Sequence, residues 1–243
     1  MSRLRRLYDR AVAGPDYPPN TADLVDVRLF GLAVPLRAGV AVLAVTALIV
    51  ADLTWLLRPG GTVGAGSVLG VGPVALTRFL LFLVAPLLIV LVVFRDDPRR
   101  YGLRLGNWRW GLGLLLAGLL VMTPIILGLA GLDAFRLYYG TTSEPLGARI
   151  ANGLVELVPA EFLLRGFLMF ALWRRIGPLA LVVALVPFVL THIGKPEVEL
   201  WSTFVGGSIF AWLDWRTGSI LWSSLGHVYV LTLMTVAVGG AAL

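Results

Sequence analysis

Long apolar runs with at most one charged residue constrain this chain more than any other feature of its sequence. The segments at about 75–94 and about 110–131 are each close to the length that a helix needs to cross the hydrocarbon core of a bilayer, about 20 residues. The whole chain is 58% apolar and 14% charged, whereas about a quarter of the residues in soluble domains are charged. The sequence therefore predicts an integral membrane protein.

Seven segments are predicted to be membrane-spanning helices. Strands are not expected, because only helices and closed barrels satisfy the backbone in lipid, and these runs are continuous rather than alternating. We therefore predict an all-α, polytopic bundle of about seven transmembrane helices. The predicted spans are about 35–57, 75–94, 110–131, 150–173, 177–193, 198–214 and 217–239.

The chain is predicted to divide into an N-terminal arm, residues 1–34, and one transmembrane domain, residues 35–243. Met1–Val12 places Arg residues opposite Leu and Val, so it either lies on anionic lipid or forms a solvated tail. No cleavable signal peptide is evident, and the first membrane helix is expected to act as the targeting signal. The stretch Gly60–Gly72 is expected to be a flexible loop.

The positive charge is distributed as a membrane protein requires, and no nucleic-acid partner is expected. The net charge is +6, and most of the basic residues lie in the arm and after the second, fourth and sixth predicted spans, while Arg58, Arg78, Arg136, Arg149 and Lys195 fall on the other side. The positive-inside rule then predicts a multi-pass protein of the cell membrane with a cytoplasmic N-terminus and an external C-terminus. Because there is no Cys, disulfides and thiolate metal sites are excluded.

Four ionisable residues interrupt the apolar pattern of the C-terminal half, namely Glu161, Arg165, His192 and His227. An ionisable group inside a membrane helix is costly and predicts a functional site. Glu161 and Arg165 are four residues apart, so they share a helix face and can pair. Each residue alone also fits a structural role, either as an ion pair or as a hydrogen-bonded His. Together, on three predicted helices, they predict one polar site in the bundle.

The order and spacing of these residues resemble the CPBP family of intramembrane proteases, which are related to the CAAX prenyl endopeptidases. The resemblance covers about 150–235 and rests on Glu161-Phe-Leu-Leu-Arg165-Gly166-Phe167, then Phe188-x-x-x-His192, then His227. It implies an endopeptidase that hydrolyses a peptide bond in a membrane-associated peptide or protein. In such an enzyme Glu161 and His192 would activate water, Arg165 would orient Glu161, and His227 would stabilise the oxyanion.

The resemblance leaves the cofactor open. Two His and a Glu can hold Zn²⁺ with one open position, but a mechanism based on Glu and His needs no metal, and no obligatory metal is expected. Nothing in the sequence predicts the oligomeric state or the identity of the substrate.

Two positions depart from the family pattern. The first motif usually reads Glu-Glu-x-x-x-Arg, and this chain has Ala160 before Glu161; the third usually has Asn or Asp where this chain has Leu231. Glu156 lies one helical turn before Ala160 and is a candidate substitute. An alternative function is therefore a non-catalytic relative that binds a peptide or a partner helix. A small transporter is a weaker alternative, because no inverted repeat is evident.

The predicted topology can be tested by labelling single cysteines, since the chain has none of its own. A membrane-impermeant maleimide should react with Leu105→Cys from the cytoplasmic side and with Leu243→Cys from the outer side. Reaction of both positions from the cytoplasmic side would contradict an odd number of spans.

Overall fold

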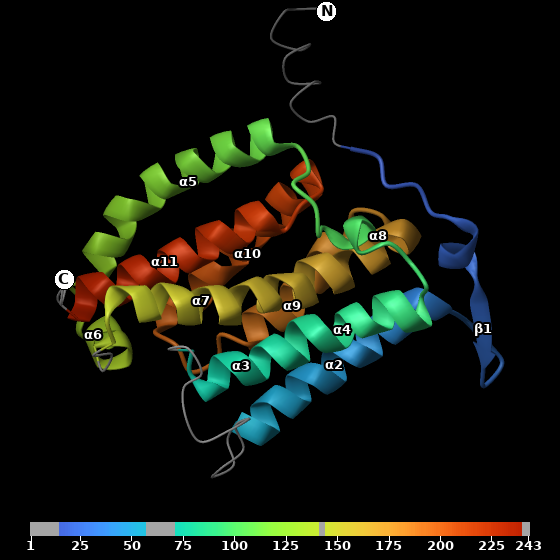
Figure 1. The fold of residues 1–243 in the computed structure, drawn as a ribbon, viewed down its shortest axis with the longest axis horizontal. Coiled ribbons are helices and arrows are strands. Elements are labelled where there is room, and N and C mark those ends of the chain that lie inside the picture. Colours follow the sequence, from blue (N-terminus) through green and yellow to red (C-terminus); the bar gives the residue numbers. More distant parts are fainter. Residues whose placement is uncertain (1–14, 57–70, 141–143, 240–243) are drawn as a thin grey trace, which may run out of the picture.

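The computed structural model describes residues 15–56, 71–140 and 144–239 of the 243-residue chain. Within these residues the protein is a bundle of helices, as predicted (Figure 1). The predicted amphipathic face of Met1–Val12 lies outside the described residues, and so does most of the predicted loop Gly60–Gly72.

The helices follow the predicted spans closely, with differences of a few residues at their ends. The first span is α2 (Leu36–Leu56), and the second is a continuous rod of α3 (Pro73–Phe79), η2 (Leu80–Val84), α4 (Ala85–Leu88) and η3 (Ile89–Val93). The third is α5 (Trp108–Leu129), and the fourth joins α7 (Leu146–Glu161), η5 (Phe162–Met169) and α8 (Phe170–Ile176). The last three are α9 (Leu179–Leu190), α10 (Glu197–Thr217) and α11 (Leu221–Gly239), and the short helices are η1 (Thr21–Leu24), η4 (Pro98–Tyr101) and α6 (Asp133–Tyr139).

Four helical segments of the described chain are long and apolar enough to cross a bilayer, judged by length and composition. These segments are Leu36–Thr54, Pro73–Val93, Trp108–Leu129 and Leu221–Gly239. The other three predicted spans are also helical, but α9 is shorter and the remaining two carry more polar residues. The protein is therefore a membrane helix bundle, while the count of seven spans stays a prediction.

The prediction that the chain has no strands is wrong at one place. Strands β1 (Asp26–Leu29) and β2 (Leu32–Pro35) form an antiparallel hairpin in which Leu29 pairs with Leu32. The argument against strands applies to backbone inside the hydrocarbon core. This hairpin precedes α2, a candidate membrane span, and lies at one end of the bundle (Figure 1). The argument therefore does not apply to it.

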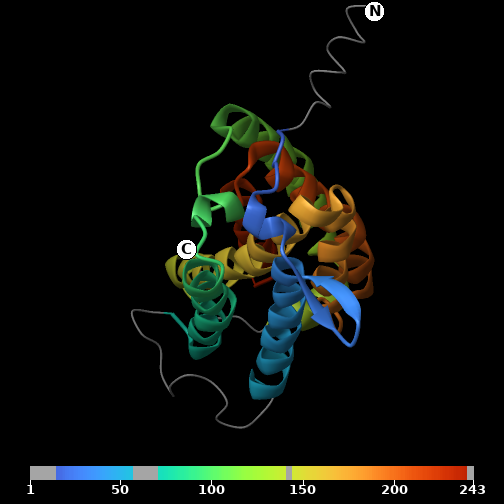
Figure 2. The same ribbon diagram turned by 90° about the vertical axis from the view of Figure 1, so that its right-hand side faces the viewer.

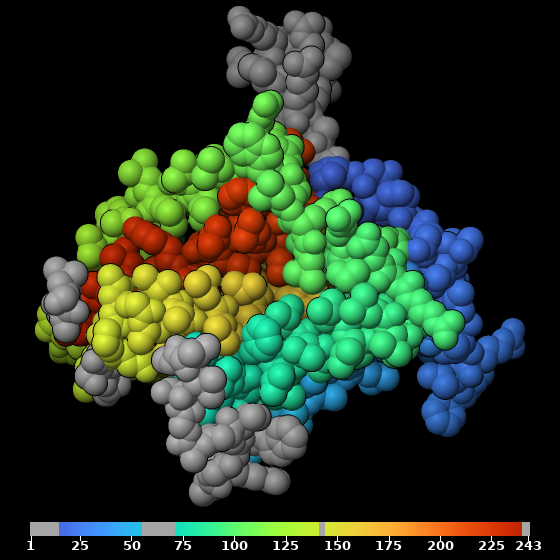
Figure 3. Space-filling view, in the orientation of Figure 1, coloured from blue at the N-terminus to red at the C-terminus, as the bar shows by residue number. Residues whose placement is uncertain are grey.

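The rod of α7, η5 and α8 occupies the middle of the bundle. Helix α11 packs against α7 and α5, α9 packs against α10 and η5, and α3 packs against α7. Figure 2 shows the bundle from its end, and Figure 3 shows α7 (yellow) between α11 (red) and the α3–α4 rod (green). The central rod therefore touches both halves of the bundle.

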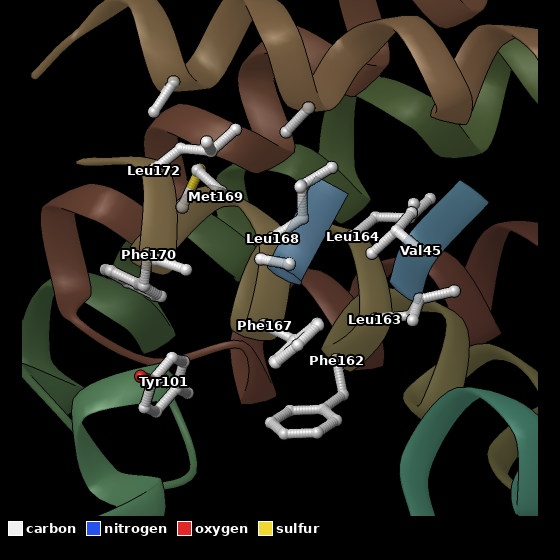
Figure 4. Close-up of a cluster of buried hydrophobic side chains, with 14 of the residues drawn as sticks. Val45, Tyr101, Phe162, Leu163, Leu164, Phe167, Leu168, Met169, Phe170 and Leu172 are labelled. Carbon is white, nitrogen blue, oxygen red and sulfur yellow. The ribbon is translucent and has the colours of Figure 1, made fainter. Parts of the chain in front are cut away.

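All eight residues of the π-helical segment η5 are buried. Phe162, Phe167 and Met169 belong to the largest apolar cluster of the described residues (Figure 4). A Cβ at Gly166 would lie 2.7 Å from the carbonyl oxygen of Tyr101, so only Gly allows this close approach. Segments of π-helix are rare and are often found at functional sites.

A network of four charged residues ties the arm to the bundle. Arg37 Nη1 lies 2.7 Å from Asp23 Oδ1 and 2.8 Å from Asp96 Oδ2. Arg100 reaches the same two carboxylates, at 2.7 Å and 2.6 Å. Tyr17 also donates from its hydroxyl to the carbonyl oxygen of Trp215, at 2.6 Å. These contacts hold the arm against the start of α2, the segment around η4 and the end of α10, which all meet at one end of the molecule.

This network makes a pH-dependent contribution to stability. Burial opposes ionisation of Asp23, but hydrogen bonds from the Asn20 backbone, Arg37 and Arg100 outweigh it and lower the pKa of Asp23 below 3.8. A carboxyl group with a lowered pKa in the folded state stabilises the protein above its ordinary pKa, and this stabilisation is lost as the pH falls through the lower folded-state pKa.

We therefore expect Asp23→Asn to lower the unfolding midpoint at pH 7, and we expect this effect to shrink progressively as the pH falls below about 3.8. Thermal unfolding in detergent across this pH range measures the difference. Asp26→Asn is the matched control, because the Asp26–Arg175 pair is more exposed. A difference between Asp23→Asn and wild type that does not change with pH would contradict the prediction.

Candidate active site

Glu161 lies at the end of α7 and is buried, with 1% of its surface exposed. Its two carboxylate oxygens have different partners. Oε1 lies 2.7 Å from Nδ1 of His227 on α11, and Oε2 accepts a hydrogen bond from Arg165, one helical turn further along. The predicted Glu161–Arg165 pair is thus present, and it is joined by His227. Both oxygens are engaged in charge-assisted hydrogen bonds, which are the strongest type.

Arg165 is buried behind Glu161 rather than in the wall of the cavity described below. Its guanidinium lies over the ring of Phe188, 4.2 Å from the ring centroid, and 5.5 Å from the centroid of Phe210. It also donates to the carbonyl oxygen of Gly207 at 3.4 Å. The cation is therefore held by one carboxylate and two aromatic faces, which is the environment that suits a desolvated guanidinium.

His192 follows the C-terminal end of α9, and its Nδ1 lies 2.7 Å from the carbonyl oxygen of Phe188. A carbonyl oxygen only accepts, so Nδ1 carries the proton and donates it. In the neutral ring Nε2 then has a free lone pair. The rings of His192 and His227 are nearly parallel, with centroids 6.3 Å apart. The structure therefore brings both His residues of the chain together.

Glu161, His192 and His227 line one cavity of about 110 Å³, which is several times the volume that one water needs. The cavity lies between α7, α9 and α11 on one side and α2 and α3 on the other, and Phe188 and Leu164 supply apolar walls. Three of the four predicted site residues therefore share a cavity, and the fourth, Arg165, contacts it only through Glu161.

A second charged group lines the same cavity and was missed by sequence reasoning. Arg78 on α3 is hydrogen-bonded to Asp52 on α2, at 3.1 Å, and to Glu156 on α7. Glu156 was considered as a free carboxylate that might replace the missing first Glu, but the structure places it in this ion triad. The available signal was Arg78 itself, since it is the only charged residue of the span Pro73–Val93.

Lys195 also lines the cavity, three residues after His192. Its ammonium lies 2.7 Å from Glu199 Oε1, and the hydroxyl of Tyr139 donates to both oxygens of Glu199. This second network connects α6 to the start of α10. It fixes the turn that carries His192.

The two departures from the family pattern have different surroundings. Ala160 lines the cavity beside Glu161, so a longer side chain there would project into the polar space. Leu231 instead packs against a separate apolar cluster that contains Ile126, Phe135 and Met234. Position 231 therefore contributes packing and supplies no hydrogen-bond donor.

The residues present do not fit the predicted possibility of a zinc site. A catalytic zinc takes three protein ligands, and no group of three His, Asp or Glu among the described residues is arranged to hold a metal ion. The two oxygens of Glu161 are already bound to Arg165 and His227.

Comparison with known families agrees with this geometry. Residues 142–233 match the family model of type II CAAX prenyl endopeptidase Rce1-like proteins. The matched segment contains Glu161, Arg165, His192 and His227, and it coincides with the part of the chain in which the sequence resembles the CPBP family. No curated protein and no solved structure matches the chain.

Removing Arg165 should destabilise the fold strongly. Arg165→Ala leaves the carboxylate of Glu161 buried without its cation, and breaking a buried pair in this way costs about 3–5 kcal/mol. Thermal unfolding in detergent should show a lower midpoint. Arg175→Ala is the control, because its pair with Asp26 has side chains that are 25% and 37% exposed and should change stability little. Equal midpoints for Arg165→Ala and Arg175→Ala would contradict a structural role for the buried pair.

Proposed function

We propose that the chain is an intramembrane endopeptidase, because residues 142–233 match the family model of type II CAAX prenyl endopeptidase Rce1-like proteins. It would hydrolyse a peptide bond in a membrane-associated peptide or protein. The observation that carries this proposal is the cavity in which two imidazoles from α9 and α11 meet the buried Glu161–Arg165 pair. Peptide hydrolysis needs a base that activates water and a donor that stabilises the oxyanion, and imidazoles in one cavity can supply both.

In the proposed reaction His192 is the base. Its Nε2 lone pair takes a proton from a water in the cavity, and the water oxygen attacks the peptide carbonyl carbon. When the carbon–nitrogen bond breaks, His192 returns this proton to the leaving amine. The hydrogen bond from Nδ1 to the Phe188 carbonyl oxygen leaves Nε2 unprotonated, and so able to accept this proton, before each turnover.

His227 is proposed to stabilise the oxyanion. An imidazolium at this position donates from Nδ1 to Glu161 and has its second N–H, at Nε2, for the developing negative charge. Glu161 compensates the positive charge of that ring, and Arg165 fixes the carboxylate. This differs in one respect from the roles that the resemblance implies, because Glu161 orients His227 and does not itself take the proton of the water.

Four variants test this division of roles with a fluorogenic farnesylated CAAX peptide in liposomes. His192→Ala should abolish detectable cleavage, since a general base contributes about 10²–10⁴-fold. Glu161→Gln keeps a hydrogen-bond partner for His227 but removes the charge, so cleavage should fall by about 10²-fold. His227→Ala should cost at least as much as Glu161→Gln. Glu156→Gln is the matched control, because Glu156 lines the same cavity but is bonded to Arg78.

Ala160 and Leu231 stand where the family pattern has Glu and Asn or Asp. The absence of those two polar groups favours the second candidate function, a non-catalytic relative that binds a peptide or partner helix. The same assay separates the two. If wild type does not cleave and Ala160→Glu does, the chain is a binding protein and the proposed activity is wrong. If wild type cleaves the peptide while Glu161→Gln and His192→Ala do not, the result supports the proposed hydrolytic site.

A further inference from the structure

The tip of the β1–β2 hairpin is the most exposed apolar feature in the described part of the arm, residues 15–34. Phe30 is fully exposed, Leu29 is 50% exposed and Leu32 is 70% exposed. Three large apolar side chains, each at least half exposed, therefore stand together at one point. In Figure 3 the hairpin (blue) projects from the molecule at the end opposite α6.

The turn at this tip is made by residues that fit it poorly. Strand partners Leu29 and Leu32 leave Phe30 and Gly31 as a two-residue loop, and both have positive φ values, 50° and 83°. Two-residue hairpin loops with positive φ at both positions strongly prefer Asn-Gly or Asp-Gly. An aromatic residue in the first position is an outlier, and strained residues persist where they have a function.

The hairpin continues directly into the lipid-facing surface of the bundle. Strand β2 ends at Pro35 and α2, a candidate membrane span, begins at Leu36. Exposed apolar residues continue along α2, including Val42 and Leu43. In Figure 1 the hairpin runs across the direction of α2 rather than along it, so with α2 crossing the membrane the hairpin lies along the membrane surface.

Charged residues lie next to the apolar tip, along the hairpin and at its base. Arg28 is exposed next to Leu29, and Arg175 pairs with Asp26 at the base of the hairpin. Apolar side chains beside Arg are the pattern of segments that bind at the membrane interface, where the apolar groups enter the acyl boundary and the guanidinium contacts phosphates.

We propose that the tip of this hairpin, formed by Leu29, Phe30 and Leu32, inserts into the headgroup region of the same leaflet that α2 enters and anchors the arm to lipid. The hairpin thereby holds the end of the bundle that carries the network of Asp23, Arg37, Asp96 and Arg100 at a fixed depth in the membrane. This inference is independent of the proposed enzymatic activity.

Single cysteines carrying an environment-sensitive fluorophore test the insertion in full-length protein reconstituted into phosphatidylcholine–phosphatidylglycerol vesicles. The label on Phe30→Cys should emit at shorter wavelength and be quenched by nitroxide-labelled lipid. The label on Asp16→Cys, an exposed arm residue outside the hairpin, should be quenched by aqueous iodide instead. Leu91→Cys, exposed on the span Pro73–Val93, is the lipid-facing reference.

Two results would overturn the proposal. One is a label at position 30 that iodide quenches as strongly as it quenches the label at position 16. The other combines two measurements on Phe30→Cys: the unlabelled protein oxidises to a disulfide-linked dimer, and the labelled protein is not quenched by nitroxide lipid. Together these results would mean that a second copy of the chain covers the tip.

A second variant separates insertion from folding of the hairpin. Phe30→Asn places a favoured residue in the turn, so the hairpin should be retained while the aromatic anchor is lost. A label on Leu32→Cys should then be quenched less by nitroxide lipid in the Phe30→Asn background than with Phe30 present. Equal quenching in both backgrounds would show that Phe30 does not anchor the hairpin.

Discussion

The bundle is organised around one buried carboxylate. A charge in the middle of an apolar bundle is tolerated only when its partners compensate for the lost hydration. Glu161 meets this requirement with two partners on opposite oxygens, Arg165 and His227. One partner lies on the same rod and the other on α11, so satisfying the charge also fixes how α11 packs against α7. The site and the fold are therefore held by the same interactions.

Phe188 extends this arrangement to a third helix. Its ring faces the guanidinium of Arg165, lies 4.6 Å from the ring of His192 and 5.9 Å from that of His227, and its carbonyl oxygen sets the tautomer of His192. A Cβ at Gly207 would lie 2.7 Å from this ring. The close approach of α9 and α10 at Gly207 therefore holds an apolar ring against Arg165, His192 and His227.

Much of the helical architecture could be predicted, because a membrane imposes a length and a composition on each span. The individual charged residues of the C-terminal half could also be singled out, since any ionisable residue in an apolar run is conspicuous. The triad of Asp52, Arg78 and Glu156 could not be predicted, because it joins three helices and its register depends on packing. The hairpin was missed for a local reason. Phe30-Gly31 lacks the Asn or Asp that marks a two-residue turn, and the segment was predicted only as part of the N-terminal arm.

The departures at positions 160 and 231 have unequal consequences for chemistry. Leu231 is part of an apolar cluster, so its change from a polar residue removes a donor from α11 and leaves His227 as the group on that helix that faces the cavity. Ala160 leaves space beside Glu161 and places no carboxylate in it. A hydrolytic site in this chain then has to work with two imidazoles. Their Nδ1 atoms have different partners, a backbone carbonyl oxygen for His192 and the Glu161 carboxylate for His227, and this difference in partners is the physical basis for giving the two rings different roles.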